Sequence, residues 1–353
     1  MPRLTTVLLA AALTPPASLL LSAQVPRLLE RVEVSRVVVD VHVLAGDGRP
    51  LRGLSAADLR LTVDGQPVPI ESVRWITGAA APSFDPHDGR MRAPAAPAGD
   101  DRPRGRRVVL LVQQDFDASR MEGLLAMRRR AEALVGSLGP DNAVAVASFQ
   151  SHLELWTDFT TDREALGAIL GRAVLASGRP PDEAGPAPSG SLRAVFDRAA
   201  GRRAATMEQA LLVLARALDG VPGPKALVLL GHGFGRIVSP AAWGALMVGF
   251  DDEYDRARRI LSRARVTVYC LDLTQADAHT LEAGLVRIAE DTGGFYARTH
   301  VFPDRAFASL GEALTGHYEV TFETPRLPWG EHRIRIDLVG RQGVVRARRF
   351  YVG

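Results

Sequence analysis

Three almost wholly apolar runs, separated by long stretches with helical spacing, constrain the fold of this chain more than any other feature. The runs cover residues 108–112, 226–230 and 266–271, and they contain no charged residue. An uninterrupted apolar run of this length is typical of a strand that is covered on both faces. Strands that alternate with helices predict a doubly wound, mostly parallel sheet, so we expect an α/β domain over residues 106–316.

The stretches between these runs carry apolar residues at helical spacing. We expect helices over the ranges 121–138, 162–175, 206–218, 240–263 and 280–291. Residues 152–157 alternate between apolar and polar side chains instead, which predicts an antiparallel edge strand.

The two ends of the chain have the pattern of strands. Residues 32–76 and 317–352 alternate apolar and polar side chains with a period of two, most clearly over 37–43. Neither set is long enough to bury a core alone. We therefore expect the N-terminal segment 24–77 and the C-terminal segment 317–353 to form one β-sandwich-like domain, with the α/β domain inserted between them.

Two smaller features complete this organisation. Ser55 stands where the N-cap of a short helical turn is expected, just before Asp58. Residues 78–105 are rich in Ala, Pro, Gly, Asp and Arg and almost lack large apolar side chains, which predicts a flexible linker.

The first residues have the composition of an export signal. Arg3 is followed by an uncharged stretch up to residue 26 with an apolar run at 7–13, and Ala23 is a small residue at a suitable cleavage position. We expect residues 1–23 to be a signal peptide and the protein to be periplasmic or secreted. An uncleaved anchor is the alternative, which a Pro-Pro pair inside the segment opposes, and it would be the only contact with a membrane.

The charge and cysteine content exclude several classes of protein. The chain has 43 Lys and Arg against 40 Asp and Glu, and the arginines are spread along it rather than gathered, so we expect no nucleic-acid partner. A single cysteine excludes an intramolecular disulfide framework and suits an oxidising compartment.

The pattern at residues 48–65 carries a family resemblance. It reads G-R-P-L-R-G-L-S-A-A-D-L-R-L-T-V-D-G, and it resembles the N-terminal segment of exported bacterial proteins labelled "VWFA-related". The order of elements over 106–316 resembles the von Willebrand factor type A domain. This resemblance implies a metal-ion-dependent adhesion site at the carboxyl ends of the strands. Such a site consists of a D-x-S-x-S run after the first strand, a Thr in a later loop and an Asp after the fourth strand.

The chain departs from this pattern at its expected site. Residues 113–119 read Q-Q-D-F-D-A-S, so either Gln113 or Asp115 takes the position of the first Asp. Residues 231–233 read G-H-G where the family has S-D-G, so a histidine replaces an aspartate. The candidate ligands are Asp115, Asp117, Ser119, Thr206 and His232.

These departures favour a degenerate site that needs no cofactor and whose residues hydrogen-bond one another. One alternative is a retained site for Mg²⁺ or another hard cation, which prefers oxygen ligands. A second is a recruited transition metal such as Zn²⁺ or Mn²⁺, because imidazole suits a softer ion.

An enzymatic alternative comes from Asp115 and Asp117. Their spacing after a strand resembles the first motif of haloacid-dehalogenase-type phosphatases, which implies a nucleophile and a general acid. Lys225, the only lysine, precedes its strand instead of following it. We therefore expect no enzymatic activity and keep a phosphatase-like hydrolase as an alternative.

The resemblance and the missing carboxylates together predict an exported, non-enzymatic module that binds a protein or peptide. The binding surface would consist of loops 113–120, 200–206, 231–238 and 272–278. His232 would make this binding sensitive to pH near 6.5. A structural component of the envelope is the remaining alternative.

Overall fold

The computed structural model describes residues 36–77, 83–85, 90–92, 105–115, 118–175, 190–238, 247–276, 279–299, 303–325 and 327–353. The predicted signal peptide, residues 1–23, lies outside this part of the chain. Among the described residues, no helix combines the length and the apolar character that crossing a membrane would need.

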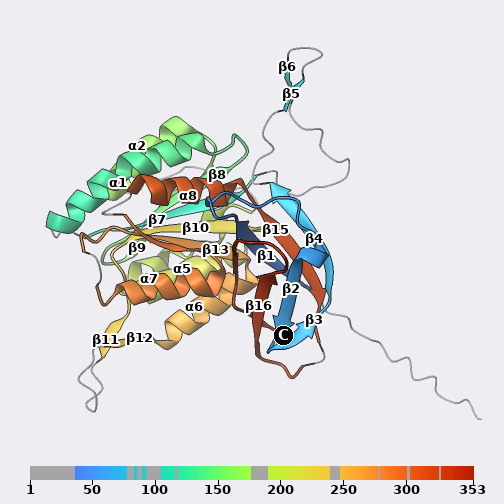
Figure 1. Ribbon diagram of the computed structural model, residues 1–353. Helices are drawn as coiled ribbons and strands as arrows, with labels where there is room; N and C mark the ends of the chain where they lie inside the picture. The colour runs from blue at the N-terminus through green and yellow to red at the C-terminus, as the bar shows by residue number, and fades with distance from the viewer. Residues whose placement is uncertain are drawn as a thin grey trace, which may run out of the picture. The chain divides into compact units, whose positions relative to one another are not determined.

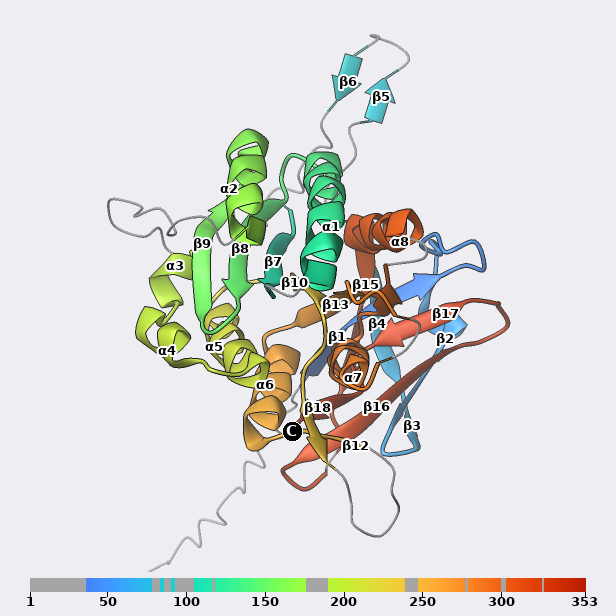
Figure 2. The same cartoon turned by 90° about the vertical axis from the view of Figure 1, so that its left-hand side faces the viewer.

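The centre of the α/β domain is a six-stranded sheet in the order β14-β13-β10-β7-β8-β9 (Figure 2). The strands are β7 (Arg107–Gln113), β8 (Ala143–Phe149), β9 (Leu153–Thr160), β10 (Lys225–Gly231), β13 (Val266–Asp272) and β14 (Tyr296–Arg298). All neighbours pair in parallel except β9, which runs antiparallel to β8 at the edge. The predictions of a mostly parallel sheet and of an antiparallel edge strand are therefore confirmed.

Helices cover both faces of this sheet (Figure 1). One face carries α1 (Ala118–Ser137), α2 (Arg163–Leu175) and α8 (Pro303–Thr315), and the other carries α5 (Met207–Asp219), α6 (Asp252–Arg263) and α7 (Glu282–Thr292). The short helices α3 (Leu192–Val195) and α4 (Arg198–Arg203) contact β9. Because strand side chains alternate, Leu110 and Val228 enter one core while Leu111 and Leu229 enter the other. This double burial explains the uninterrupted apolar runs.

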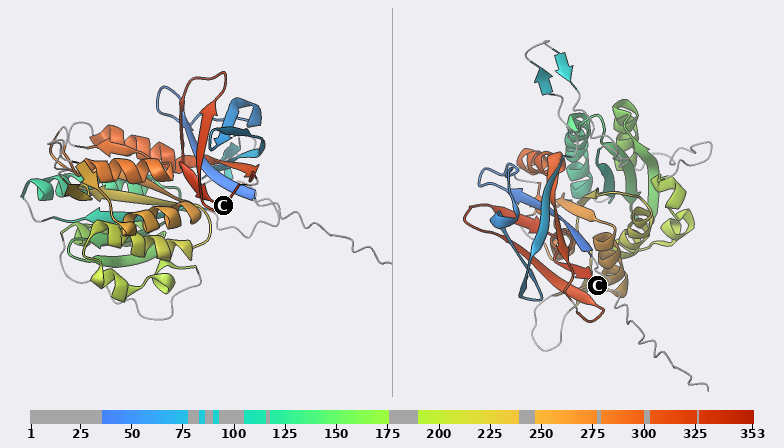
Figure 3. Two further views of the ribbon diagram at one scale, coloured as in Figure 1. Left: turned by 90° about the horizontal axis from the view of Figure 1, so that it is seen from below. Right: turned by 90° about the vertical axis from the view of Figure 1, so that its right-hand side faces the viewer.

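Strands from both ends of the chain form two antiparallel sheets (Figure 3). The first has the order β17-β1-β15-β4, with β1 (Arg36–Leu44), β4 (Ile70–Thr77), β15 (Gly316–Glu323) and β17 (Val344–Ala347). The second has the order β18-β16-β2-β3, with β2 (Leu59–Val63), β3 (Gln66–Val68), β16 (Glu331–Leu338) and β18 (Phe350–Val352). They share one apolar core that includes Val41, Leu61, Phe322 and Ile336. The prediction that the N- and C-terminal strands fold together is confirmed.

Local capping signals fix several boundaries. Ser55 is the N-cap of the 3-10 turn η1 (Ala56–Asp58) as predicted, and its backbone N–H donates to Asp58 Oδ2 at 2.8 Å. The helix predicted over 240–263 begins only at Asp252, because the Asp251 side chain accepts the Tyr254 N–H at 3.1 Å and acts as its N-cap. That prediction is therefore wrong for 247–251.

Two short antiparallel pairs were not expected. Before α6, the strands β11 (Arg236–Val238) and β12 (Met247–Gly249) pair with each other. Within the predicted linker, β5 (Ser83–Asp85) pairs with β6 (Arg90–Arg92).

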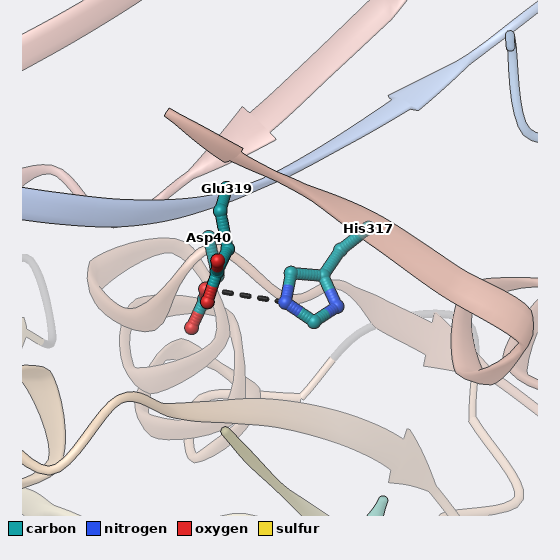
Figure 4. A group of neighbouring side chains, drawn as sticks. All are labelled: Asp40, His317 and Glu319. Carbon is teal, nitrogen blue, oxygen red and sulfur yellow. Dashed lines mark ion pairs between the residues drawn. The ribbon is translucent and has the colours of Figure 1, made fainter. Parts of the chain in front are cut away.

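A buried polar group, here called the junction cluster, joins the sandwich to the α/β domain. It consists of Asp40 on β1, His317 and Glu319 on β15, and Arg265, which precedes β13. The guanidinium of Arg265 bonds the Asp40 carboxylate and lies 2.6 Å from Glu319 Oε1, while His317 Nε2 lies 3.2 Å from Asp40 Oδ1 (Figure 4). Burial would raise the pKa of Asp40, but His317 and Arg265 outweigh it and hold that pKa well below its usual range.

Removing one charge from this cluster should destabilise the fold strongly. Asp40→Asn or Arg265→Met leaves a buried partner uncompensated, and we expect the free energy of unfolding to fall by about 3 kcal/mol. The exposed pair Arg335 and Asp337 gives the control, since Arg335→Met should cost less than about 1 kcal/mol. Urea unfolding at neutral pH measures both effects, and equal losses in the two variants would contradict the assignment.

Two buried histidines at this junction should make stability fall in mild acid. Burial is the main cause that lowers the pKa of both His42 and His317. His42 Nε2 lies 3.1 Å from Tyr269 Oη. Below pH about 6.5 the unfolded chain binds protons that the folded chain does not, so stability should fall by about 1 kcal/mol per pH unit for each histidine.

Measuring the free energy of unfolding between pH 7.5 and 5 checks this slope. His42→Gln should reduce it by about 1 kcal/mol per pH unit. An unchanged slope in His42→Gln would show that His42 takes up its proton in the folded state.

Candidate functional site

The carboxyl ends of β7, β10 and β13 meet at one edge of the sheet, here called the carboxyl edge. Gln113 is the last residue of β7, and Gly231 and Asp272 are paired at the ends of β10 and β13. The backbone N–H of Leu273 donates to Gly231 O at 2.8 Å. Open α/β sheets bind their ligands at this edge, so it is the place to look for a site.

Gln113 ties the end of β7 to the loop that follows β10. Its Nε2 donates to Gly233 O at 2.9 Å, and its Oε1 accepts the backbone N–H of His232 at 2.9 Å. A Cβ at Gly231 would lie 2.5 Å from Gln113 Oε1, and one at Gly233, where φ is +100°, would lie 2.5 Å from Leu281 O. Close packing therefore requires both glycines of the G-H-G sequence, Gly231 against the Gln113 amide and Gly233 against Leu281.

The candidate metal ligands named from the sequence do not all have side chains free at the carboxyl edge. His232 is 2% exposed, so its imidazole lies beneath the surface, and Asp115 is half-buried two residues beyond β7. Thr206 is exposed and serves as the N-cap of α5, with its Oγ1 accepting the Gln209 N–H at 3.2 Å. Asp117 lies outside the described residues, and so does the side chain of Ser119 in the first turn of α1.

In the register that places Gln113 first, an amide and an imidazole stand where the family resemblance calls for carboxylates. Because β7 ends at Gln113, this residue occupies the terminal strand position and Asp115 lies beyond it. Mg²⁺ and Ca²⁺ prefer carboxylate and other oxygen ligands, and both polar atoms of the Gln113 amide are already bonded to the backbone. Among the described residues, the groups that bring three His, Cys, Asp or Glu together include neither Asp115 nor His232. The donors at 113 and 232 do not fit a hard-cation site.

A second group at the carboxyl edge, here called the edge network, consists of Asp272, His279, Glu282 and Tyr296. Asp272 is 1% exposed, and its Oδ2 lies 2.7 Å from both His279 Nε2 and Tyr296 Oη. Tyr296 Oη also donates to Glu282 Oε2 at 3.0 Å. Burial, followed by the two carboxylates, raises the pKa of Tyr296 far above its usual range, so the phenol keeps its proton.

The edge network could hold a metal ion only by giving up existing bonds. Ligand atoms of Asp272, His279 and Glu282 lie within 4.8 Å of one another. The Arg298 guanidinium, however, donates to Glu282 Oε1 at 3.0 Å and to Glu282 Oε2 at 2.9 Å. Asp272 Oδ1 also accepts the Thr274 N–H at 2.9 Å. Beside this network, His279 and Glu282 line a groove of about 950 Å³ whose walls carry charges of both signs.

Asp272 ends a predicted strand, where a helix cap is the usual role of an aspartate, and His279 belongs to no motif of the sequence. The hydrogen bond that Asp272 accepts from the Thr274 N–H, two residues on, is typical of a cap. The contact of Asp272 with His279, seven residues on, is not. A usable signal was present, because His279 and Glu282 are three residues apart at the start of a helix that follows the strand.

Lys225 lies at the opposite end of β10. It is 2% exposed, and its Nζ donates to the carbonyl oxygens of Val221 and Gly223, both at 2.6 Å. Burial, with the nearby charges of Arg265 and Arg107, lowers its pKa to about 8. This amine is therefore not available to neutralise a phosphate at the carboxyl edge.

The strand order and flanking helices form a doubly wound α/β fold, which is the architecture that the resemblance to the von Willebrand factor type A domain implies. No model of a known family matches the chain, and no curated protein matches it. Solved structures of similar chain path include BatB from Bacteroides thetaiotaomicron, with 14% identity, a TM-score of 0.35, and coverage of 60% of this chain and 97% of that chain.

Two further structures of similar chain path are known. One is a von Willebrand factor type A protein from Catenulispora acidiphila, with 11% identity, a TM-score of 0.39, and coverage of 90% and 72% of the two chains. The other is manganese-loaded TRAP from Plasmodium vivax, with 12% identity, a TM-score of 0.38, and coverage of 69% and 92%.

Shortening Gln113 should loosen the carboxyl edge. Gln113→Ala removes two hydrogen bonds to the 232–233 backbone, and we expect the free energy of unfolding to fall by about 2 kcal/mol. Gln150→Ala, in the exposed β8–β9 turn, is the control and should cost less than about 0.5 kcal/mol. Chemical unfolding of the two variants checks this, and a loss no larger than that of the control would exclude a structural role for the amide.

Proposed function

We propose that this protein is an exported, non-enzymatic binding module of the adhesion type whose inherited metal site is degenerate. The observation that carries the proposal is the double use of the Gln113 amide, which bonds the backbone at His232 and Gly233. An amide in this role replaces the anion that a divalent cation needs. The partner is a protein or peptide that contacts loops 113–120, 200–206, 231–238 and 272–278 through ordinary polar and aromatic groups.

The burial of His232 changes one earlier expectation. Because its side chain is 2% exposed, the imidazole is not available for direct contact with a partner. The pH-sensitive binding that the sequence suggested therefore has no direct route through this residue. The exposed groups of the same loops, such as Thr206, are better placed to make contacts.

The position of Lys225 supports the non-enzymatic part of the proposal. A phosphatase-like reaction at Asp115 would need a cation beside the transferred phosphoryl group. The only lysine of the chain lies at the amino end of β10, bonded to backbone carbonyls. We expect no turnover of p-nitrophenyl phosphate with or without Mg²⁺, and a rate that Asp115→Asn abolishes would contradict the proposal.

Calorimetric titration of Mg²⁺, Mn²⁺ and Zn²⁺ into chelator-stripped protein tests the degenerate site. We expect weak or no binding of Mg²⁺ and Mn²⁺, because no carboxylate stands at positions 113 and 232. The double variant Gln113→Asp/His232→Asp restores both carboxylates and should gain Mg²⁺ affinity if it stays folded by circular dichroism. A tight one-to-one site in the unaltered protein that Asp115→Ala abolishes would overturn the proposal.

The edge network supports a second candidate, a softer divalent cation. Its imidazole and two carboxylates are a donor set that suits Zn²⁺. Zn²⁺ binding that His279→Ala removes and Asp115→Ala leaves intact would assign the ion to the edge network.

A further inference from the structure

A strongly basic groove lies at the other end of the sheet, away from the carboxyl edge. It has a volume of about 790 Å³, and α5, α6, β1, β18 and the loop before β16 line it. Half of its lining residues are arginines and none is acidic. We call it the arginine groove. Since the charge of the whole chain is only +3, this concentration of positive charge is a local feature of the fold.

Three of these arginines project into solvent without an acidic partner among the described residues. They are Arg216 on α5 and Arg256 and Arg259 on α6, and all three are exposed. Arg256 and Arg259 are three residues apart on α6, so they lie on the same side of the helix. Their guanidinium groups are therefore available to a ligand.

The other four arginines are held by the fold, and three of them are paired with carboxylates. Arg263 lies 2.5 Å from Asp219, and Arg36 lies 2.9 Å from Glu71. Arg265 belongs to the junction cluster. Arg348 donates to Ser262 O at 2.6 Å and to Val38 O at 2.9 Å, and burial lowers its pKa to about 10, so it stays protonated at neutral pH.

The remaining wall of the groove is apolar. Trp329 is 86% exposed and Val352 is 44% exposed, and both line the groove. Val37 and Ile260 extend this wall toward β1 and α6. The groove therefore presents guanidinium groups next to an aromatic and aliphatic surface.

We propose that the arginine groove is a second binding surface, which takes an extended acidic peptide segment of a partner protein. Carboxylates of the segment would pair with Arg216, Arg256 and Arg259, since guanidinium and carboxylate form two parallel hydrogen bonds. An apolar side chain between these acids would pack on Trp329. The concave shape favours a peptide over a flat bilayer, and the apolar wall favours it over a uniformly polar acidic polysaccharide. This surface does not depend on the function proposed for the carboxyl edge.

Fluorescence anisotropy with the full chain tests the proposal. The probe is a fluorescein-labelled peptide made of two copies of Glu-Asp-Leu-Glu-Phe, and the comparison peptide carries Gln and Asn in place of the acids. We expect saturable binding of the acidic peptide that weakens as salt rises, with at least tenfold weaker binding of the neutral peptide.

Surface variants identify the place of binding. Arg256→Glu/Arg259→Glu should weaken the acidic peptide at least tenfold and Trp329→Ala several-fold. The matched control Arg129→Glu/Arg305→Glu reverses two exposed arginines on α1 and α8 and should change affinity less than twofold at physiological salt. All these positions are exposed, so their unfolding midpoints should match that of the unaltered protein.

Three results would overturn the proposal. The first is no binding of the acidic peptide, and the second is equal binding of both peptides or of the groove variant and its control. The third is that the protein does not bind the peptide but binds phosphatidylglycerol vesicles or polygalacturonate, and that Arg256→Glu/Arg259→Glu abolishes this binding. That result would assign the groove to a membrane surface or to a polysaccharide.

Discussion

The partly buried guanidinium of Arg265 is the contact on which the arrangement of the two described domains depends. It comes from the turn before β13 in the α/β domain and reaches Asp40 on β1 and Glu319 on β15 of the sandwich. A buried charge is tolerated only when partners compensate it, so this cluster excludes arrangements that would separate the two domains. Arg348 repeats the connection by bonding the backbone of α6 and of β1. The polar character of the junction therefore fixes its geometry.

The two ends of the central sheet differ in how their polar groups are used. At the carboxyl edge, the amide of Gln113 and the carboxylates of Asp272 and Glu282 are bonded within the protein, which favours a rigid surface over an open ligand site. At the other end, Arg216, Arg256 and Arg259 have no acidic partner among the described residues. Charge that the fold does not neutralise is the stronger indication of a ligand.

The buried reactive groups of the α/β domain fit a structural role. Cys270 lies inside β13, and burial raises the pKa of its thiol, so it is neither a nucleophile nor a ready metal ligand. Lys225 caps the turn before β10 through its two carbonyl contacts. Both side chains therefore serve the packing of the domain.

What the sequence determined by itself was local. Apolar runs, helical periods and the Ser55 cap depend on neighbours within a few residues, and each gave an element close to its observed place. The helix expected from 240 failed for a local reason too, since the Asp251 cap outweighs the apolar pattern before it. The roles of Asp115, Asp117, Ser119, Thr206 and His232 as ligands stay predictions.

What only the tertiary structure decided was which distant residues meet. His42 and Tyr269 are 227 residues apart and yet share a hydrogen bond, and the arginine groove combines helices of the α/β domain with strands from both chain ends. Such contacts arise from burial of the whole core, which no short stretch of sequence encodes. The sequence pattern could therefore predict the strands but not which distant residues their side chains contact.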